Sequence, residues 1–207
     1  NISMLLDRYN TDEGPYAGKI ESAGQPMFAM GVKIFDLNDE EVPPGTVGEI
    51  VARGPHVMAG YWNKPEETAY ALRRGWMHTG DIGYLDEDGF LFIVDRVKDM
   101  IISGGENIYS TEVEAVIYQH TAVAECAVIG IPNKKWGESV HAIVVPKRGH
   151  TLTEEEIIAH CREHIAGYKC PRSIDIHLDP LPMSGAGKIL KKVLREPFWE
   201  SKERQIN

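Results

Sequence analysis

The sequence contains little cysteine, no long apolar run and no excess of positive charge. Its three cysteines, Cys126, Cys161 and Cys170, are an odd number without paired spacing, which is typical of reduced thiols and argues against a disulfide framework. No apolar run approaches the roughly 20 residues that span a membrane. No basic n-region followed by an apolar h-region opens the chain. These absences predict a cytoplasmic protein without a transmembrane segment.

Acidic residues outnumber basic ones in this chain. Its 207 residues include 31 Asp and Glu and 22 Lys and Arg, for a formal net charge of −9. Such a surface repels phosphate, so the composition argues against a general nucleic-acid or membrane-surface binder. Apolar residues make up 43% of the chain, which is enough for a packed core in one large domain or two small ones.

Residues 18–95 contain short strand-like runs between turn signals. The expected strands are 33–37, 49–54, 82–85 and 90–95. A Pro-Pro-Gly sequence at 43–45 marks one turn, and Asp88-Gly89 between two apolar runs predicts a hairpin. Residues 64–75 predict a short helix with Pro65 in its first turn. This half predicts a small antiparallel β-barrel-like subdomain.

Residues 99–207 alternate strand-like and helix-like patterns. The expected strands are 124–131, 139–146 and 172–178, and the expected helices begin at Thr111, Thr153 and Gly187. Thr111 with Glu114, and Thr153 with Glu156, have capping-box spacing. The pattern predicts a compact α+β domain after a boundary near residues 94–99. The whole chain is therefore predicted to be an α+β protein of two parts, 1–95 and 96–207.

Several motifs, in one order, resemble the AMP-forming adenylate enzymes, which include acyl-CoA synthetases, peptide-synthetase adenylation domains and insect luciferases. They are RGWMHTGDIG (74–83), VDRVKD (94–99), GGENIYSTEVE (104–114), KKWGESV (134–140) and LPMSGAGKILKKVLRE (181–196). The third and fourth motifs are most similar to those of CoA ligases for fatty or aromatic acids. The resemblance implies that residues 1–95 end a large N-terminal domain and that residues 96–207 form a small mobile AMP-binding domain.

Asp81 lies close to Gly80 and Gly83. A carboxylate accepts two hydrogen bonds at once, which suits the cis-diol of a ribose, and the glycines let a ligand approach the backbone. A turn aspartate entering a strand is the structural alternative. The resemblance implies that Asp81 binds the ribose hydroxyls of ATP and of the acyl-adenylate. It also implies that Arg96 reaches the ribose and phosphate region, although a surface ion pair would explain this arginine too.

Lys188 lies in SGAGKIL, which is not a Walker A loop, because Pro182 and Ile189 stand where that loop needs a glycine and a Ser or Thr. The resemblance implies the family's C-terminal glycine-lysine motif instead. Its lysine approaches the substrate carboxylate and the α-phosphate, where an ammonium group neutralises charge that develops during attack on phosphorus. A solvated lysine beside Lys191 and Lys192 is the alternative.

The resemblance also implies a CoA site and a hinge in the second part. The implied CoA-binding residues are Gly104, Gly105, Trp136, Tyr168, Lys169 and Arg172. The glycine pair would otherwise be a tight turn and the tryptophan a core residue. Cys170 departs from the family pattern, since some relatives carry a basic residue there. Lys98 falls at the hinge position, whose backbone would absorb a rotation of the small domain; an exposed lysine in a charged loop is the alternative.

His160 and His164 fit the H-x-x-E-H pattern of some zinc proteases and would share a helix face. The two histidines flank the expected apolar stripe of that helix, and the helix lies inside the family resemblance. The sequence therefore predicts no metal ligand in this chain. The Mg²⁺ ligand that the resemblance implies is expected N-terminal to residue 1.

Residues 1–207 contain neither the Gly/Ser/Thr-rich phosphate loop nor the Thr-Glu motif of the family. We therefore expect this chain to be the C-terminal piece of an acyl-CoA synthetase, inactive without the N-terminal domain of the same polypeptide. The implied reaction converts a fatty or aromatic carboxylic acid, ATP and CoA into acyl-CoA, AMP and pyrophosphate.

Two alternatives remain open. In a peptide-synthetase adenylation domain a carrier domain would normally follow, and none does in this sequence. In a non-catalytic binding or regulatory module of the same fold the chemistry would be lost. The joint retention of Asp81, Arg96 and Lys188 argues against the second alternative.

Overall fold

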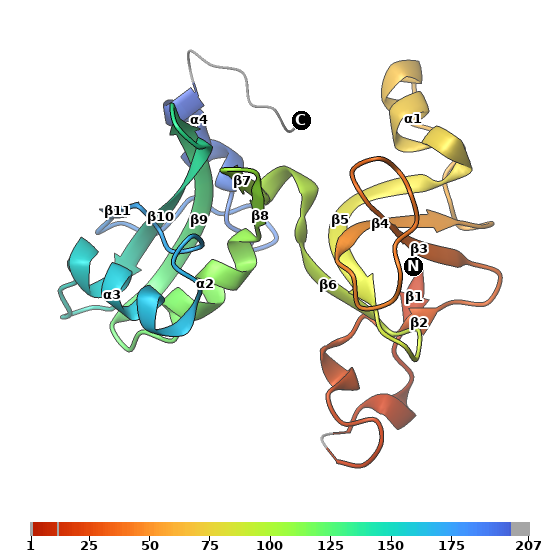
Figure 1. The fold of residues 1–207 in the computed structure, drawn as a ribbon, viewed down its shortest axis with the longest axis horizontal. Helices are drawn as coiled ribbons and strands as arrows, with labels where there is room; N and C mark the ends of the chain where they lie inside the picture. Colours follow the sequence, from red (N-terminus) through yellow and green to blue (C-terminus); the bar gives the residue numbers. More distant parts are fainter. Residues whose placement is uncertain (1, 12, 200–207) are drawn as a thin grey trace. The chain divides into compact units, whose positions relative to one another are not determined.

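A computed structural model describes residues 2–11 and 13–199 of the chain. It divides into two compact units, Asn1–Val97 and Lys98–Asn207, which we call the N-terminal and the C-terminal unit (Figure 1). Both combine short helices with sheets that are mainly antiparallel. The α+β class predicted from the sequence is therefore confirmed.

The N-terminal unit is built on a four-stranded antiparallel sheet in the order β3-β4-β5-β6. These strands are Gly31–Phe35, Gly48–Arg53, Met77–Leu85 and Leu91–Arg96. A separate pair, β1 (Ser3–Met4) with β2 (Gln25–Pro26), lies outside this sheet. The four strands form an open sheet, not a closed barrel. One face buries an apolar cluster of Val32, Ile34, Ile50 and Leu91.

A single short helix, α1 (Pro65–Ala71), connects β4 to β5. Pro65 occupies its first turn, where a missing N–H costs nothing, and two glutamates in that turn complement the helix dipole. The predicted helix 64–75 is too long at its C-terminal end. Arg74 has a left-handed backbone (φ 53°) within the short 3₁₀ turn Arg73–Gly75, so the chain leaves the helix there.

The C-terminal unit contains a five-stranded sheet with β10 at its centre. Strand β10 (Gly137–Pro146) pairs along its length with antiparallel β9 (Val123–Asn133). On its other edge it pairs in parallel with β11 (Ser173–Ile176), and its first residue meets β7 (Ile101–Ser103), which continues the sheet to β8 (Glu106–Ile108). Helices α2 (Ser110–Tyr118), α3 (Glu154–His164) and α4 (Lys191–Trp199) complete this unit.

Both faces of this sheet are covered, which explains why the sequences of β9 and β10 are almost continuously apolar. Alternate residues such as Val128 and Val140 face the helices α2 and α3. Residues of the other parity, such as Ile129 and Ile143, face the opposite cluster, which includes Leu194 and Phe198 of α4. Side chains alternate between the two faces of a strand, so a sheet buried on both sides needs apolar residues at every position.

Of the two capping boxes that the sequence predicts, one is confirmed. Thr153 accepts a hydrogen bond from the backbone of Glu156, whose side chain accepts from Thr153 in return. The Thr111–Glu114 box is wrong, because α2 starts at Ser110 and its N-cap is Tyr109, two residues before Thr111. The Glu114 carboxylate instead accepts the backbone N–H of Val128 at 2.7 Å, so packing against β9 outweighs the local cap.

The last helix also starts later than expected. Residues 187–190 do not belong to α4, which begins at Lys191. Gly187 is left-handed (φ 74°), and Met183 pairs with Ile189 across a tight turn. A left-handed glycine ends helical geometry, so the segment with Lys188 is a hairpin turn and not the first turn of a helix.

The three cysteines are free, as the sequence predicts, and all three are buried. Burial raises the pKa of Cys126 to about 12 and that of Cys161 to about 11, so neither thiol is a nucleophile near neutral pH. None of the described helices is long and apolar enough to cross a membrane.

A titratable side chain, His141, lies inside the C-terminal unit with 2% of its surface exposed. Its Nδ1 lies 2.8 Å from the hydroxyl of Ser173, its ring centroid is 5.0 Å from that of Phe198, and Asp175 Oδ2 is 3.4 Å from Nε2. Burial lowers the pKa of His141, with Asp175 and Glu154 opposing the shift and His177 adding to it. The folded state therefore prefers the neutral imidazole.

This burial predicts a pH-dependent stability. A histidine whose pKa is lowered on folding binds fewer protons in the folded state, so the free energy of unfolding decreases as pH falls below the unfolded value of about 6.5. Replacing His141 by Gln removes this contribution. Urea denaturation at several pH values between 5 and 8 should show a shallower loss of stability for His141→Gln than for wild type. Parallel curves for the two proteins would contradict the assignment.

Candidate functional site

Asp81 is displayed by irregular pairing on both sides of β5. The register shifts between β4 and β5 after Glu49, and between β5 and β6 after Ile82. The preceding residue, Gly80, is left-handed (φ 75°), a conformation that strongly favours glycine. Bulges of this kind re-aim side chains at the edges of active sites, and here the bulged residue precedes the aspartate.

The structure brings Asp81 and Arg96 together. They are directly opposite each other in the β5–β6 ladder, and the Nε atom of Arg96 lies 3.6 Å from Oδ1 of Asp81. Their side chains are 39% and 50% exposed respectively, so the pair is weak and screened by water. Both groups can therefore exchange this contact for a ligand that offers hydroxyl donors to the carboxylate and an anion to the guanidinium.

Thr79 and Glu49 hold the backbone of this bulge. The hydroxyl of Thr79 donates to the carbonyl of Ile50 at 2.7 Å and accepts the N–H of Asp81 at 3.1 Å. Glu49 Oε1 accepts the N–H of Gly80 at 3.2 Å. Since a bulge takes backbone groups out of the ladder, these side chains replace the lost partners.

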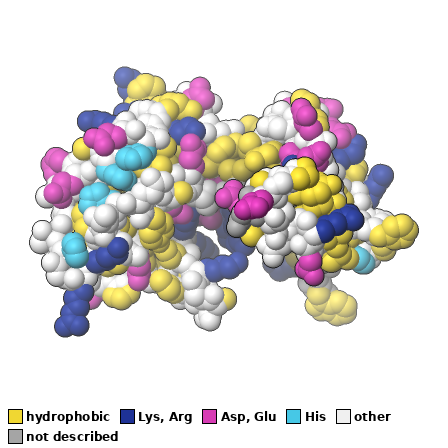
Figure 2. Space-filling view, turned by 90° about the horizontal axis from the view of Figure 1, so that it is seen from below, with side chains coloured by type: hydrophobic (Ala, Val, Ile, Leu, Met, Phe, Trp, Pro, Cys, Tyr) yellow, Lys and Arg dark blue, Asp and Glu magenta, His cyan; other side chains and the backbone are white. Residues whose placement is uncertain are grey.

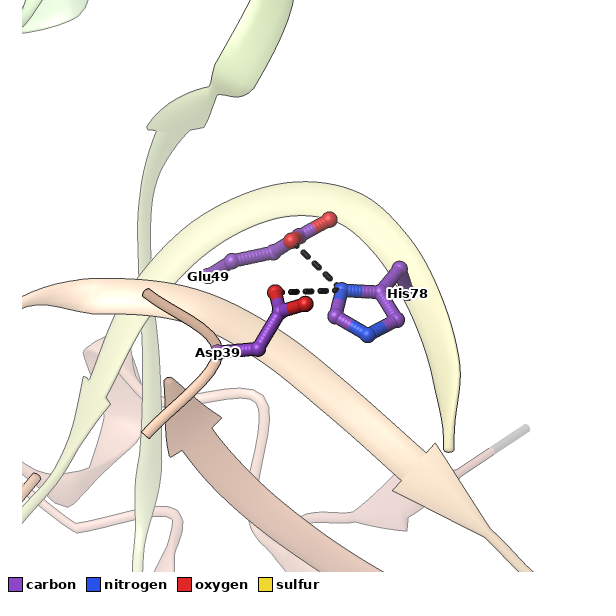
Figure 3. A group of neighbouring side chains, drawn as sticks. All are labelled: Asp39, Glu49 and His78. Carbon is purple, nitrogen blue, oxygen red and sulfur yellow. Dashed lines mark hydrogen bonds and ion pairs between the residues drawn. The ribbon is translucent and has the colours of Figure 1, made fainter. Parts of the chain in front are cut away.

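Glu49 belongs to a network that the sequence did not indicate (Figure 3). Its Oε2 is 2.7 Å from Nδ1 of His78, and the same nitrogen is 3.9 Å from Oδ1 of Asp39. Arg73 donates hydrogen bonds to Asp39 from Nε at 3.1 Å and from Nη2 at 3.0 Å. Its Nη2 also donates to Oε2 of Glu49 at 3.3 Å. Hydrogen bonding from Arg73 lowers the pKa of Asp39. The members are five to thirty-nine positions apart in sequence, without a spacing that would predict the network.

Asp39, Glu49 and His78 place three potential metal-ligand atoms within 4.8 Å of one another. The guanidinium of Arg73 already shares oxygens of both carboxylates, and a cation would have to displace it. The remaining ring nitrogen of His78, Nε2, points away from the carboxylates in Figure 3 and is buried without a hydrogen-bond partner among the described residues. We therefore interpret the cluster as an ion-pair support for the Gly80 bulge.

Lys188 is exposed on a hairpin turn in the C-terminal unit. Its backbone carbonyl accepts from Ser184 N–H at 2.8 Å, and its own N–H donates to Ser184 Oγ at 3.2 Å. The turn is thus fixed by its backbone. Within the described part of the chain no hydrogen bond or ion pair engages the ammonium group, which remains available for an anionic ligand.

Three of the expected CoA-binding residues lie together. Gly104 donates its N–H to the carbonyl of Trp136 at 2.8 Å, and a Cβ at Gly104 would come within 2.8 Å of the indole ring. The Arg172 guanidinium lies 5.3 Å from the centre of that ring and Lys135 Nζ lies 4.5 Å from it. Glycine is needed at 104 both for its left-handed backbone (φ 65°) and for this close approach.

Tyr168 and Lys169 belong to a second group. The ammonium of Lys169 lies 2.6 and 2.8 Å from the two carboxylate oxygens of Glu112 on α2, and this hydrogen bonding raises the pKa of Lys169. Tyr168 is 46% exposed and its ring lies 5.8 Å from the same ammonium. Lys169 is therefore less free to bind phosphate than Arg172, because its charge is already paired.

Lys98, His160 and His164 are the remaining candidates from the sequence. Lys98 is the first residue of the C-terminal unit, and its carbonyl accepts a hydrogen bond from Arg195. His160 and His164 have rings 4.4 Å apart, but His160 Nε2 faces the carbonyl of Val116 and His164 Nδ1 faces that of His160. Figure 2 shows histidine side chains gathered on the surface of this unit. The contact of His160 with Val116 joins α3 to α2, whereas the contacts between the two histidines lie within α3.

Comparison with known proteins assigns a family to this arrangement. Residues 3–62 match the model of the AMP-binding enzymes, and residues 112–188 match that of the AMP-binding enzyme C-terminal domain. The chain belongs to the AMP-binding enzyme family. The two matches fall in the two units, and the second ends at Lys188.

Relatives in this family include CoA ligases. A feruloyl-CoA synthase of Amycolatopsis sp is 50% identical over 94% of this chain, and a long-chain-fatty-acid–CoA ligase of Escherichia coli O6:H1 is 46% identical over 84%. The o-succinylbenzoate CoA synthetase of Bacillus subtilis, solved with its acyl-adenylate intermediate, superimposes with a TM-score of 0.80 at 37% identity over 100% of the chain. The chain spans 38%, 31% and 39% of these three proteins respectively.

The network around Glu49 leads to a stability prediction. Glu49→Ala leaves Gly80 N–H, His78 and Arg73 without their shared acceptor, and the loss of such a partly buried network costs about 3 kcal/mol of unfolding free energy. The matched control is Glu41→Ala, since Glu41 makes only an exposed pair with Lys33; about 0.5 kcal/mol or less is expected there. Urea denaturation measures both, and equal losses would contradict the proposed support.

Proposed function

We propose that the gene product carrying this segment is an ATP-dependent acyl-CoA synthetase. The observation that carries the proposal is the display of Asp81 beside Arg96 on a bulged strand. A hairpin that leaves the Lys188 ammonium free accompanies it in the same chain. Membership of the AMP-binding enzyme family supports the proposal. Because ATP and CoA are cytoplasmic substrates, we place the activity in the cytoplasm.

In the proposed first step, a carboxylate oxygen of the acid attacks the α-phosphorus of ATP and pyrophosphate leaves. Asp81 accepts hydrogen bonds from both ribose hydroxyls, and Arg96 lies close enough to Asp81 to reach the adjoining phosphate region. Lys188 neutralises the charge that develops on the attacked phosphate. Asp81 supplies two oxygen acceptors, Arg96 supplies a rigid guanidinium, and Lys188 supplies an ammonium group.

In the proposed second step, the thiol of CoA attacks the acyl carbonyl, its proton is lost, and AMP leaves. The mixed anhydride makes AMP a far better leaving group than hydroxide. The Trp136 ring, with Gly104 beneath it and Arg172 beside it, offers an apolar surface and a cation for the thiol arm and the nucleotide of CoA. The C-terminal unit would turn about Lys98 between the two steps, as the small mobile domain of the family does.

We propose a fatty or aromatic acid as substrate, in line with the feruloyl-CoA synthase and the fatty-acid ligase among the relatives. The 207 residues contain neither the family's Gly/Ser/Thr-rich phosphate loop nor its Thr-Glu motif, which the resemblance implies would hold Mg²⁺ and nucleotide. We therefore expect the isolated 207-residue chain to be inactive in adenylation. Assay of the isolated chain beside the full-length gene product tests this expectation directly.

A matched pair of lysine variants tests the first step. In the full-length gene product, Lys188→Ala should lower ATP–pyrophosphate exchange by about 10²–10³-fold, the usual effect of losing one transition-state charge contact. Lys192→Ala is the control, because Lys192 is 83% exposed and contacts only Glu196 at 4.0 Å; no change is expected. A panel of fatty and aromatic acids should be used for the exchange assay.

The outcomes separate the alternatives. Exchange with an acid, but without thioester formation on CoA, would favour a peptide-synthetase adenylation domain. Nucleotide binding without exchange for any acid would favour a non-catalytic binding module. Wild-type exchange in Lys188→Ala would show that the role given to Lys188 is wrong.

Substitution of Trp136 tests the second step. Trp136→Ala removes the ring that covers Gly104 and Arg172, so the rate of thioester formation from acyl-AMP should fall about tenfold. The exchange reaction should stay unchanged, because the ring acts only on CoA. Trp136→Phe keeps an aromatic surface and should recover most of the rate. Equal losses in exchange and thioester formation would contradict a role confined to CoA.

A further inference from the structure

Helix α4 carries two largely shielded basic side chains four residues apart on one face. Lys191 and Arg195 expose only 14% and 12% of their side chains. Lys191 Nζ lies 2.7 Å from Glu114 Oε1 and donates to Ser110 Oγ at 2.7 Å, so it fastens α4 to α2. A buried cation is retained only where it is paired and hydrogen-bonded, and Lys191 meets that condition within the body of the unit.

Arg195 contacts Lys98 and Asp99, the first two residues of the C-terminal unit after the chain junction. The Nη1 atom of Arg195 donates to the carbonyl of Lys98 at 2.9 Å and lies 3.6 Å from Oδ1 of Asp99. Lys98 is the first residue of the C-terminal unit, and the Asp99 side chain is only 14% exposed. A guanidinium suits this position because one of its nitrogens, Nη1, carries two N–H groups and lies near both a carbonyl and a carboxylate.

The Lys188 hairpin and α4 form one packed body. Leu190 N–H donates to Pro182 O at 2.8 Å, across the base of the hairpin. Ile189 from the hairpin packs against the same apolar cluster as Leu194 and Phe198 from the helix. Trp199 Nε1 donates to the carbonyl of Gly130 at 3.0 Å, which fixes the far end of α4 on β9. A displacement of α4 at Arg195 is therefore expected to move the Lys188 hairpin as well.

We propose that Arg195 is a positioning residue that ties the start of the C-terminal unit to the body carrying Lys188. When the unit turns about the junction, Arg195 makes the Lys98–Asp99 segment and the Lys188 hairpin move together, so the ammonium reaches a defined position. Lys191 anchors the same helix without touching the junction, and Lys192 faces solvent. This inference rests on the adenylation proposed above, but the anchor itself is independent of it.

Limited trypsin digestion of the 207-residue chain tests the anchor. Cleavage after Lys98 requires the junction to open locally, so Arg195→Met should raise its initial rate about tenfold, read by mass spectrometry. Lys191→Met and Lys192→Met should leave the rate at that site near wild type, and Arg195→Lys should lie between. Asp99→Asn should change the rate in the same direction, which serves if Arg195→Met fails to fold. No rise, or an equal rise in Lys191→Met, would overturn the anchor.

A double-mutant cycle in the full-length gene product tests the role in adenylation. Arg195→Met should lower ATP–pyrophosphate exchange about tenfold with the acid KM unchanged, and Lys192→Met should not. If Arg195 acts through Lys188, it should cause no further loss in the Lys188→Ala background. The same loss in both backgrounds would overturn the positioning role. Absence of exchange in the wild type would instead remove the proposed function, whereas the proteolysis result reports on the anchor separately.

Discussion

The carboxylate of Glu49 is the interaction on which the candidate nucleotide site depends. The bulge in β5 turns Asp81 outward and removes the N–H of Gly80 from the ladder, and a buried donor without an acceptor is costly. Glu49 supplies that acceptor with one oxygen and holds His78 with the other, while Arg73 and Asp39 balance its charge. The display of one exposed aspartate therefore rests on a partly buried network of four residues behind it.

In the C-terminal unit, too, an exposed residue, Lys188, is positioned by packed elements other than its own side-chain contacts. The sheet is buried on both faces, which fixes β9 and β10 as a rigid base. Helix α4 is held on β9 by the indole N–H of Trp199, on α2 by Lys191 and on the Lys98–Asp99 segment by Arg195, and the Lys188 hairpin precedes its N-terminal end. The exposed ammonium has no partner of its own among the described residues, so its position comes entirely from the backbone that carries it.

The contacts also divide the residues implicated in CoA binding by their availability. Gly104, Trp136 and Arg172 form one group, in which the guanidinium of Arg172 is exposed and lies over the partly exposed ring. Lys169, although adjacent in sequence to Tyr168, forms an ion pair with Glu112. Neighbours in a basic sequence motif can therefore differ in function, because a paired ammonium must break its ion pair before it binds a phosphate.

The sequence by itself determined the α+β class, most strands, the Thr153 cap, the free cysteines and the family, because these depend on local periodicity, turn chemistry and motif order. Only the tertiary structure decided three other features. Glu114 accepts the N–H of Val128 and does not form the expected cap. The segment at Lys188 is a hairpin turn. Glu49 contacts both His78 and Arg73 near the bulge that carries Asp81. Each of these depends on a partner distant in sequence or on a left-handed glycine whose effect is set by packing. Local pattern carries no information about such partners, since burial decides which acceptor a donor reaches.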